Sequence, residues 1–126
     1  MTIACEPGDL LSKDAAILLG EVVSVEDRRG VTFVGLDVGW NLNCSYFIYR
    51  FAQEFVVCRA AGADRTERVT VAGNINEAGD VFAEDYAMSQ VEEGDIVATL
   101  NAGGYLQAMS STHCLRPLAK AVFLDR

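Results

Sequence analysis

Basic side chains are scarce in this sequence. Lysine and arginine together number 10, against 18 aspartates and glutamates, which gives a net charge of −8. Proteins that bind nucleic acid or anionic membranes depend on lysine and arginine to neutralise phosphate groups. The charge balance therefore argues against nucleic acid and against an anionic membrane as partners.

Closely spaced cysteine pairs and long apolar runs are also missing. The cysteines Cys5, Cys44, Cys58 and Cys114 lie far apart without a C-x-x-C pair, so neither a zinc site nor a disulfide framework is predicted. We expect free, mostly buried thiols. No basic region precedes an apolar one at the start, and no apolar run is long enough to span a bilayer. These features are typical of a soluble cytoplasmic protein.

The length supports one domain, and half of the residues are apolar, which is enough for one ordinary core. Apolar positions recur with a helical period from Leu10 to Leu19, between the Pro7-Gly8 turn and Gly20. This pattern predicts a helix of about three turns, with Asp9 or Ser12 as its N-cap.

The remainder is typical of short strands joined by turns. β-branched residues at 21–26 and 31–38 flank the turn residues 27–30, which predicts a hairpin whose second strand is central. Further strands are expected at 55–59, 68–71, 96–101 and 119–124, and a half-exposed surface at 40–49. One helix and many short strands predict a mostly β fold, an antiparallel Greek-key β-barrel or sandwich with one N-terminal helix.

Five short motifs follow one another along the chain. They are Glu6-Pro7-Gly8-Asp9, Asp37-Val38-Gly39-Trp40-Asn41, Gly73-Asn74-Ile75-Asn76-Glu77-Ala78-Gly79-Asp80, Glu92-Glu93-Gly94-Asp95 and Gly103-Gly104-Tyr105. In this order and spacing the chain resembles the C-terminal sheet domain of the fold-type III decarboxylases that use pyridoxal phosphate, which include diaminopimelate, ornithine and arginine decarboxylases. The family's motifs are E-P-G-R, D-x-G-x-N, G-P-x-C-[ED]-x-x-D, E-x-G-D and G-A-Y.

The resemblance implies two cofactor-binding residues. Glu6 stands where the family places the carboxylate that pairs with the pyridine nitrogen, and Tyr105 matches the tyrosine whose hydroxyl contacts the phosphate. Asp9 stands where the family has an arginine that binds the phosphate, and its charge would repel that group. Without the resemblance, Glu6 is an ordinary turn carboxylate and Tyr105 an aromatic plug at a strand end.

The resemblance also implies substrate-binding residues. Glu77 matches the acidic residue that binds the distal ammonium of diaminopimelate, although a solvated loop glutamate is the ordinary alternative. Ser45 stands where that enzyme has an arginine, which argues against diaminopimelate as the substrate. Arg50 stands where ornithine decarboxylase has an aspartate that faces the amine. We therefore expect a carboxylate or other anionic group at the distal end of the substrate.

Two residues are candidates for catalysis. Asn76 stands where most of these enzymes carry a cysteine that the partner subunit inserts to help protonate the product, and an amide cannot supply that proton. His113, the only histidine, is the best local replacement, because the unperturbed pKa of the histidine side chain lies near neutral. The alternative is a packed, hydrogen-bonded histidine with no catalytic role.

The family architecture implies that the chain is part of a larger enzyme. Residues 1–20 would be the remnant of the last strand and helix of a (β/α)8 barrel, and 21–126 the C-terminal β-sheet domain. The expected partners are the missing N-terminal barrel, a second copy in a homodimer and an amino acid substrate, with pyridoxal phosphate bound in the full enzyme. The chain alone would be inactive. A free-standing β-sheet binding module without catalytic activity is the alternative.

Overall fold

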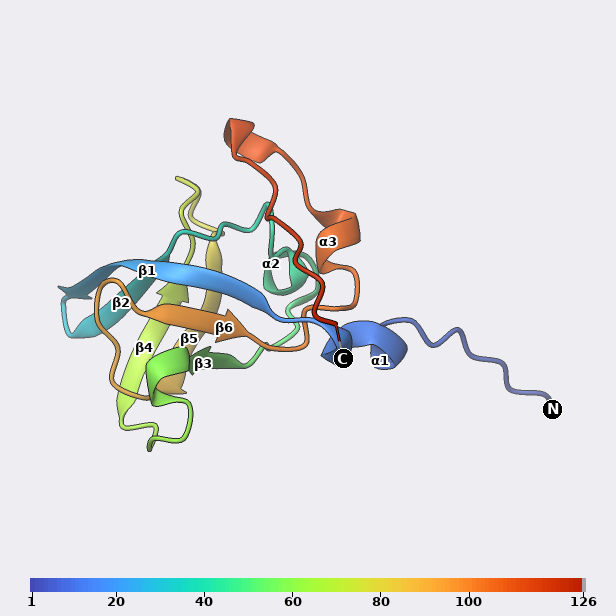
Figure 1. Cartoon of the computed structure of the whole chain (residues 1–126), viewed down its shortest axis with the longest axis horizontal. Helices are drawn as coiled ribbons and strands as arrows, with labels where there is room; N and C mark the ends of the chain where they lie inside the picture. Colours follow the sequence, from blue (N-terminus) through green and yellow to red (C-terminus); the bar gives the residue numbers. More distant parts are fainter. Residues whose placement is uncertain (126) are drawn as a thin grey trace.

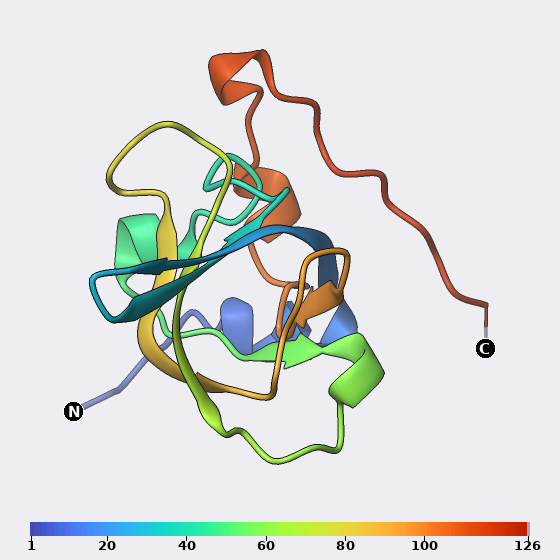
Figure 2. The ribbon, with the colours of Figure 1, turned by 90° about the vertical axis from the view of Figure 1, so that its left-hand side faces the viewer.

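The computed structural model describes residues 1–125 and is built around one sheet of six strands (Figure 1). The strands are β1 (Leu18–Arg28), β2 (Val31–Leu36), β3 (Phe55–Val57), β4 (Glu67–Ala72), β5 (Val81–Met88) and β6 (Ile96–Thr99). Their order across the sheet is β3-β6-β1-β2-β4-β5. Figure 2 shows the sheet curling around a central core. The two edge strands nearly close it into a barrel, because the Tyr86 hydroxyl in β5 accepts the Phe55 N–H of β3 at 2.9 Å.

The predicted hairpin is confirmed as β1 and β2, which pair antiparallel from Val22↔Leu36 to Arg28↔Val31. Its turn residues Arg29 and Gly30 both have positive φ, +59° and +82°. This is the geometry of a type I′ turn, whose twist matches that of the flanking strands. As predicted, β2 is central, between β1 and β4.

The mostly β class is confirmed, but the expectation of a wholly antiparallel sheet is wrong at one pair. Strands β2 and β4 run parallel, with Val34 opposite Val71. Parallel neighbours need a long crossover, and the chain between them contains β3 and the short helix α2 (Ser45–Tyr49). This crossover places α2 against the turn that follows β2 and the loop between β4 and β5.

The core is made of aliphatic, aromatic and methionine side chains from all six strands and from Val38 after β2. Its fully or nearly fully buried members are Val22, Val34, Leu36, Val38, Phe55, Val57, Val69, Val71, Phe82, Met88 and Val97. Burial of such side chains is the main stabilising contribution, about 1.5–3 kcal/mol for each relative to exposure.

The predicted three-turn helix is wrong. Helix α1 spans only Asp9–Ser12 with Gly8 as its N-cap, and a 3₁₀ turn follows at Lys13–Ala15, with Ser12 at its N-cap but without a capping hydrogen bond from the side chain. Leu18 and Leu19 instead pair with Thr99 and Ala98 of β6. Leu10 and Leu11 are 74% and 72% exposed. A longer helix would therefore have no core surface to pack against. The residues expected in its last turn, Leu18 and Leu19, form hydrogen-bonded pairs in the sheet instead.

The predicted closing strand at 119–124 is also wrong. This segment has no regular structure and its apolar side chains are exposed, Phe123 at 89%. Figure 2 shows it as an extended segment outside the sheet. The expectation of mostly buried thiols fails too: all four cysteines are free, but only Cys44 is buried. No helix within residues 1–125 is long and apolar enough to cross a membrane.

Candidate functional site

Asp80 fixes the loop between β4 and β5 against the turn that follows β2. Its carboxylate accepts the Trp40 N–H at 2.7 Å and the Ile75 N–H at 2.6 Å, and the residue is only 3% exposed. A Cβ at Gly73 would clash with both carboxylate oxygens, so this position requires glycine. Burial raises the pKa of Asp80, and the nearby charge of Glu77 raises it further, against the lowering effect of the two N–H donors.

Glu77, at the tip of this loop, contacts two aromatic side chains. Its Oε1 lies 2.8 Å from Nε2 of His113, and its Oε2 accepts the indole N–H of Trp40 at 3.1 Å. The Trp40 and His113 rings lie 4.5 Å apart between centroids. The side chains of His113 and Glu77 are 36% and 42% exposed, so the pair faces solvent.

The segment that carries His113 is held at both ends. Ser111 donates its N–H to the Asn41 carbonyl at 2.8 Å, and Asn41 Nδ2 donates to the Ser111 carbonyl at 3.1 Å. Arg116 donates to the Asn74 carbonyl at 2.7 Å. Asn41 is 2% exposed, so the expectation of a half-exposed surface is wrong here. Its amide is buried because it anchors this segment.

Cys114 belongs to the same group of side chains. The ligand atoms of Glu77, His113 and Cys114 all lie within 4.8 Å of one another. Cys114 has φ +54°, the left-handed conformation that non-glycine residues rarely adopt. We call Trp40, Glu77, His113 and Cys114 the Glu77 cluster.

A groove of about 730 Å³ lies on the other side of α2. It is lined by Asp9, Lys13, Ser45, Tyr49, Arg50, Phe51, Ala52, Gln53, Asn101, Gly104, Tyr105 and Leu106, and we call it the Arg50 groove. Arg50 ends α2 with φ +57°, and its guanidinium carbon lies 5.2 Å from the Tyr46 ring centroid. Two cationic side chains, Lys13 and Arg50, therefore line the groove against the single carboxylate of Asp9.

Glycines bring the N-terminal turn against the Gly-Gly-Tyr turn. A Cβ at Gly8 would clash with the Tyr105 hydroxyl, and a Cβ at Gly104 would clash with the Asp9 carboxylate. The first and last of the five motifs are therefore in contact.

Helix α2 connects the two regions. Its Phe47 stacks on Trp40 of the Glu77 cluster with ring centroids 4.9 Å apart. The backbone of Gly79 packs directly against the Phe47 ring. Ser45 and Arg50, at the two ends of this helix, line the Arg50 groove. Both regions therefore share residues of one short helix.

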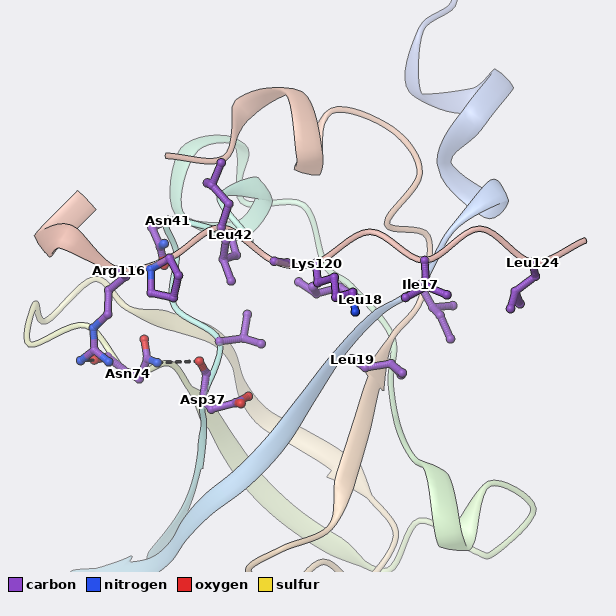
Figure 3. Close-up of a pocket in the computed structure, with 15 residues that line it drawn as sticks. Ile17, Leu18, Leu19, Asp37, Asn41, Leu42, Asn74, Arg116, Lys120 and Leu124 are labelled. Atoms are coloured by element: carbon purple, nitrogen blue, oxygen red, sulfur yellow. Dashed lines mark hydrogen bonds between the residues drawn. The ribbon is translucent and has the colours of Figure 1, made fainter. Parts of the chain in front are cut away.

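A second cavity, of about 690 Å³, lies between the start of β1 and the C-terminal segment (Figure 3). Its lining is mainly apolar and includes Ile17, Leu18, Leu42, Leu118 and Leu124. At the polar edge of this cavity, Asn74 Nδ2 donates a hydrogen bond to the Asp37 carbonyl at 2.5 Å. This bond is the dashed line in Figure 3. None of the predicted site residues lines this cavity.

The structure groups most of the predicted site residues. Glu77 and His113 pair directly, with Asn76 exposed beside Glu77 in the same loop, and Ser45, Arg50 and Tyr105 share the groove. Glu6 lies on the exposed N-terminal segment and lines neither cavity. The roles of these residues stay predictions.

Sequence reasoning missed the contributions of Trp40, Lys13, Asp80 and Cys114. The missed Cys114 follows the only histidine directly, and this adjacency was the one signal for it in the sequence.

The chain is thus a six-stranded, nearly closed barrel that exposes a glutamate–histidine pair and a groove with two cationic side chains. The family described as pyridoxal-dependent decarboxylase, C-terminal sheet domain, matches residues 9–103, and the chain belongs to this family. The resemblance inferred from the five motifs is therefore confirmed.

Individual relatives are diaminopimelate decarboxylases. The chain is 35% identical over 112 residues to that of Methanothermobacter thermautotrophicus, covering 89% of the chain and 26% of the relative. It is 31% identical over 121 residues to that of Bacillus subtilis, covering 95% of the chain and 28% of the relative. The crystal structure of the enzyme from M. jannaschii in complex with L-lysine matches with a TM-score of 0.80 and 30% identity, over 88% of this chain and 25% of that one. The chain thus spans little more than a quarter of the length of such relatives.

Proposed function

We propose that this chain is the C-terminal domain of a pyridoxal phosphate-dependent amino acid decarboxylase. In this proposal an N-terminal (β/α)8 barrel, with residues 1–20 as its last strand and helix, completes the active site, which forms between the subunits of a homodimer. The domain contributes loops that contact substrate and cofactor and has no activity alone. The coverage of the relatives supports this proposal, because about three quarters of each relative lies outside the match.

The observation that carries the proposal is that the Glu77 cluster and the Arg50 groove lie beside each other and are both exposed. Glu77 and Tyr105 are both exposed, Tyr105 at 53%, rather than sealed in the core. Apolar side chains beside the groove are exposed as well, including Phe51 at 56%. Polar site residues beside uncovered apolar surface are typical of a site that a second protein surface completes.

The residues of the groove fit an anionic phosphate group. Tyr105 offers a hydroxyl donor, and Lys13 and Arg50 give the lining a net positive charge despite Asp9. Glu6 would face the pyridine nitrogen. When bound, pyridoxal phosphate supplies the electron sink that decarboxylation requires. The tasks of this chain are then to hold the cofactor's phosphate and to orient the substrate.

We assign to Arg50 the binding of an anionic group at the distal end of the substrate. Arg50 lines the groove at a helix end beside the small side chain of Ser45, and a guanidinium can bind a carboxylate through two parallel hydrogen bonds. Glu77 would accept hydrogen bonds from an amine. The imidazole of His113, hydrogen-bonded to Glu77 through Nε2, would be the proton donor, a role that the amide of Asn76 cannot take.

The test compares two matched variants of the full-length enzyme. Arg50 and Arg29 both have left-handed φ, +57° and +59°, which asparagine tolerates better than alanine. Arg50→Asn is expected to reduce kcat/KM for substrates with an anionic distal group by about tenfold to a hundredfold, the equivalent of about 1.5–3 kcal/mol for a charged hydrogen bond. Arg29→Asn, at the hairpin tip, is expected to change nothing. An unchanged preference between anionic and cationic substrates in Arg50→Asn would remove the assignment.

A further inference from the structure

The side chains of the Glu77 cluster combine three donor types that transition metals bind together. Glu77 offers a carboxylate oxygen, His113 an imidazole nitrogen and Cys114 a thiol sulfur, all within 4.8 Å of one another. A tetrahedral zinc ion, with bonds of about 2.0–2.3 Å, needs its ligand atoms roughly 3.3–3.6 Å apart. The Glu77 Oε1 to His113 Nε2 distance of 2.8 Å lies just below this spacing, and the distances to the Cys114 sulfur are at most 4.8 Å, so shifts of about 1 Å bring the three ligands to it.

The backbone around these ligands is fixed before any ion binds. The buried Asp80 carboxylate and the hydrogen bond from the Asp80 N–H to the Glu77 carbonyl, at 3.0 Å, set the loop that carries Glu77. Hydrogen bonds at Ser111 and Arg116 hold the segment with His113 and Cys114 from both sides. Ligands on two anchored segments lose little conformational entropy on binding.

The surroundings also suit a cation. Trp40 donates its indole N–H to Glu77 Oε2 at 3.1 Å, which orients the carboxylate and leaves Oε1 toward His113. Such outer hydrogen bonds are typical of metal-ligating carboxylates. The chain carries a net charge of −8, which attracts cations.

We propose that Glu77, His113 and Cys114 form a binding site for a zinc-class divalent cation, with a fourth coordination position open to solvent. The mixed nitrogen, sulfur and oxygen donors favour such an ion over Mg²⁺ or Ca²⁺, which prefer oxygen ligands alone. Binding replaces the proton shared between Nε2 and Oε1 and the thiol proton of Cys114, so protons are released to solvent. The ion and a substrate amine would compete for the Glu77 carboxylate. The proposal does not depend on the decarboxylase assignment.

The test measures metal binding on the full-length protein after removal of metals with a chelator. Zn²⁺ binding is followed by equilibrium dialysis, and Co²⁺ serves as an optical probe. We expect one saturable Zn²⁺ per chain, with affinity reduced at least tenfold in Cys114→Ser and in His113→Gln, since loss of even an outer-shell partner costs tenfold to a hundredfold. Trp40→Phe is expected to lose about tenfold for that outer-shell reason.

Cys58→Ser is the matched control, because Cys58 is an exposed free thiol outside the cluster. It should keep both the Zn²⁺ affinity and the thiolate-to-Co²⁺ charge-transfer absorption, which Cys114→Ser should lose. Equal Zn²⁺ affinity in wild type, Cys114→Ser and His113→Gln would overturn the proposal, and so would the absence of saturable binding. Decarboxylase activity is not part of the readout, so this proposal and the proposed function can fail separately.

Discussion

Replacing Asp80 with asparagine tests whether one buried carboxylate organises the loop that carries Glu77. The carboxylate accepts two backbone N–H groups, at 2.7 Å and 2.6 Å. An asparagine amide offers only one oxygen, so either Trp40 or Ile75 is left with a buried N–H facing an NH₂ group. A lost hydrogen bond to a charged acceptor costs about 1.5–3 kcal/mol, and an unsatisfied buried donor costs about 1–3 kcal/mol. Relief of the buried charge offsets part of this cost. We expect the free energy of unfolding to fall by about 2–4 kcal/mol.

The expected change is large enough to measure by thermal unfolding. An unfolding entropy of about 2.1 cal/mol/K per residue gives roughly 0.26 kcal/mol/K for 126 residues, so a loss of about 3 kcal/mol lowers Tm by about 11 °C. The assay follows circular dichroism together with the fluorescence of Trp40, the single tryptophan. The backbone N–H of Trp40 donates one of the two hydrogen bonds to Asp80. Asp64→Asn, in an exposed loop, is the control. A Tm of Asp80→Asn within about 2 °C of wild type would refute the reasoning.

Two further predictions concern the core and the pH dependence of stability. Phe82→Ala should lower the free energy of unfolding by about 3–5 kcal/mol in denaturant titrations because Phe82 is 1% exposed, while Phe123→Ala, at 89% exposed, should change it by less than about 0.5 kcal/mol. The pKa of Asp95 is lowered, chiefly by its hydrogen bond from Arg59, so its contribution is present above the ordinary aspartate range and is lost as pH falls through the lowered value. The pKa of Asp80 is raised, so its contribution is present at low pH and is lost as pH rises through the raised value. In a plot of Tm against pH, Asp95→Asn should therefore reduce the slope on the acid side. Asp80→Asn should reduce the slope in the pH region just above it. Profiles that run parallel to that of the wild type would contradict both expected directions.

The parts of the fold that follow from local pattern were predictable from the sequence. The hairpin of β1 and β2 has β-branched residues on both sides of Arg29-Gly30, and β4 and β6 lie where strands are predicted at 68–71 and 96–101. The five motifs also identified the family. The helix expected at 10–19 failed because tertiary pairing with β6 decided the structure of Leu18 and Leu19, which local periodicity cannot reveal.

The site was predictable in its parts but not in its assembly. The family motifs point to Glu77, and His113 is proposed as the only histidine, yet their 2.8 Å contact joins residues 36 positions apart and depends on how the segment after α3 (Leu106–Met109) is anchored. Asn41 supplies that anchor, and its buried amide contradicts what its polar character suggests. The position of Cys114 beside this pair followed from the same anchoring, so spacing rules for cysteine could not detect it.

The most direct test of the central claim is the affinity of the full-length protein for pyridoxal phosphate in a Tyr105→Phe variant. The claim is that the Tyr105 turn forms one side of a cofactor pocket that other parts of the enzyme complete. Loss of a hydroxyl bonded to a charged phosphate should weaken binding by about tenfold to a hundredfold. Tyr86→Phe, which removes a hydroxyl that bridges β5 and β3 away from the groove, should leave the affinity unchanged. Equal cofactor affinity in Tyr105→Phe and wild type would contradict the account.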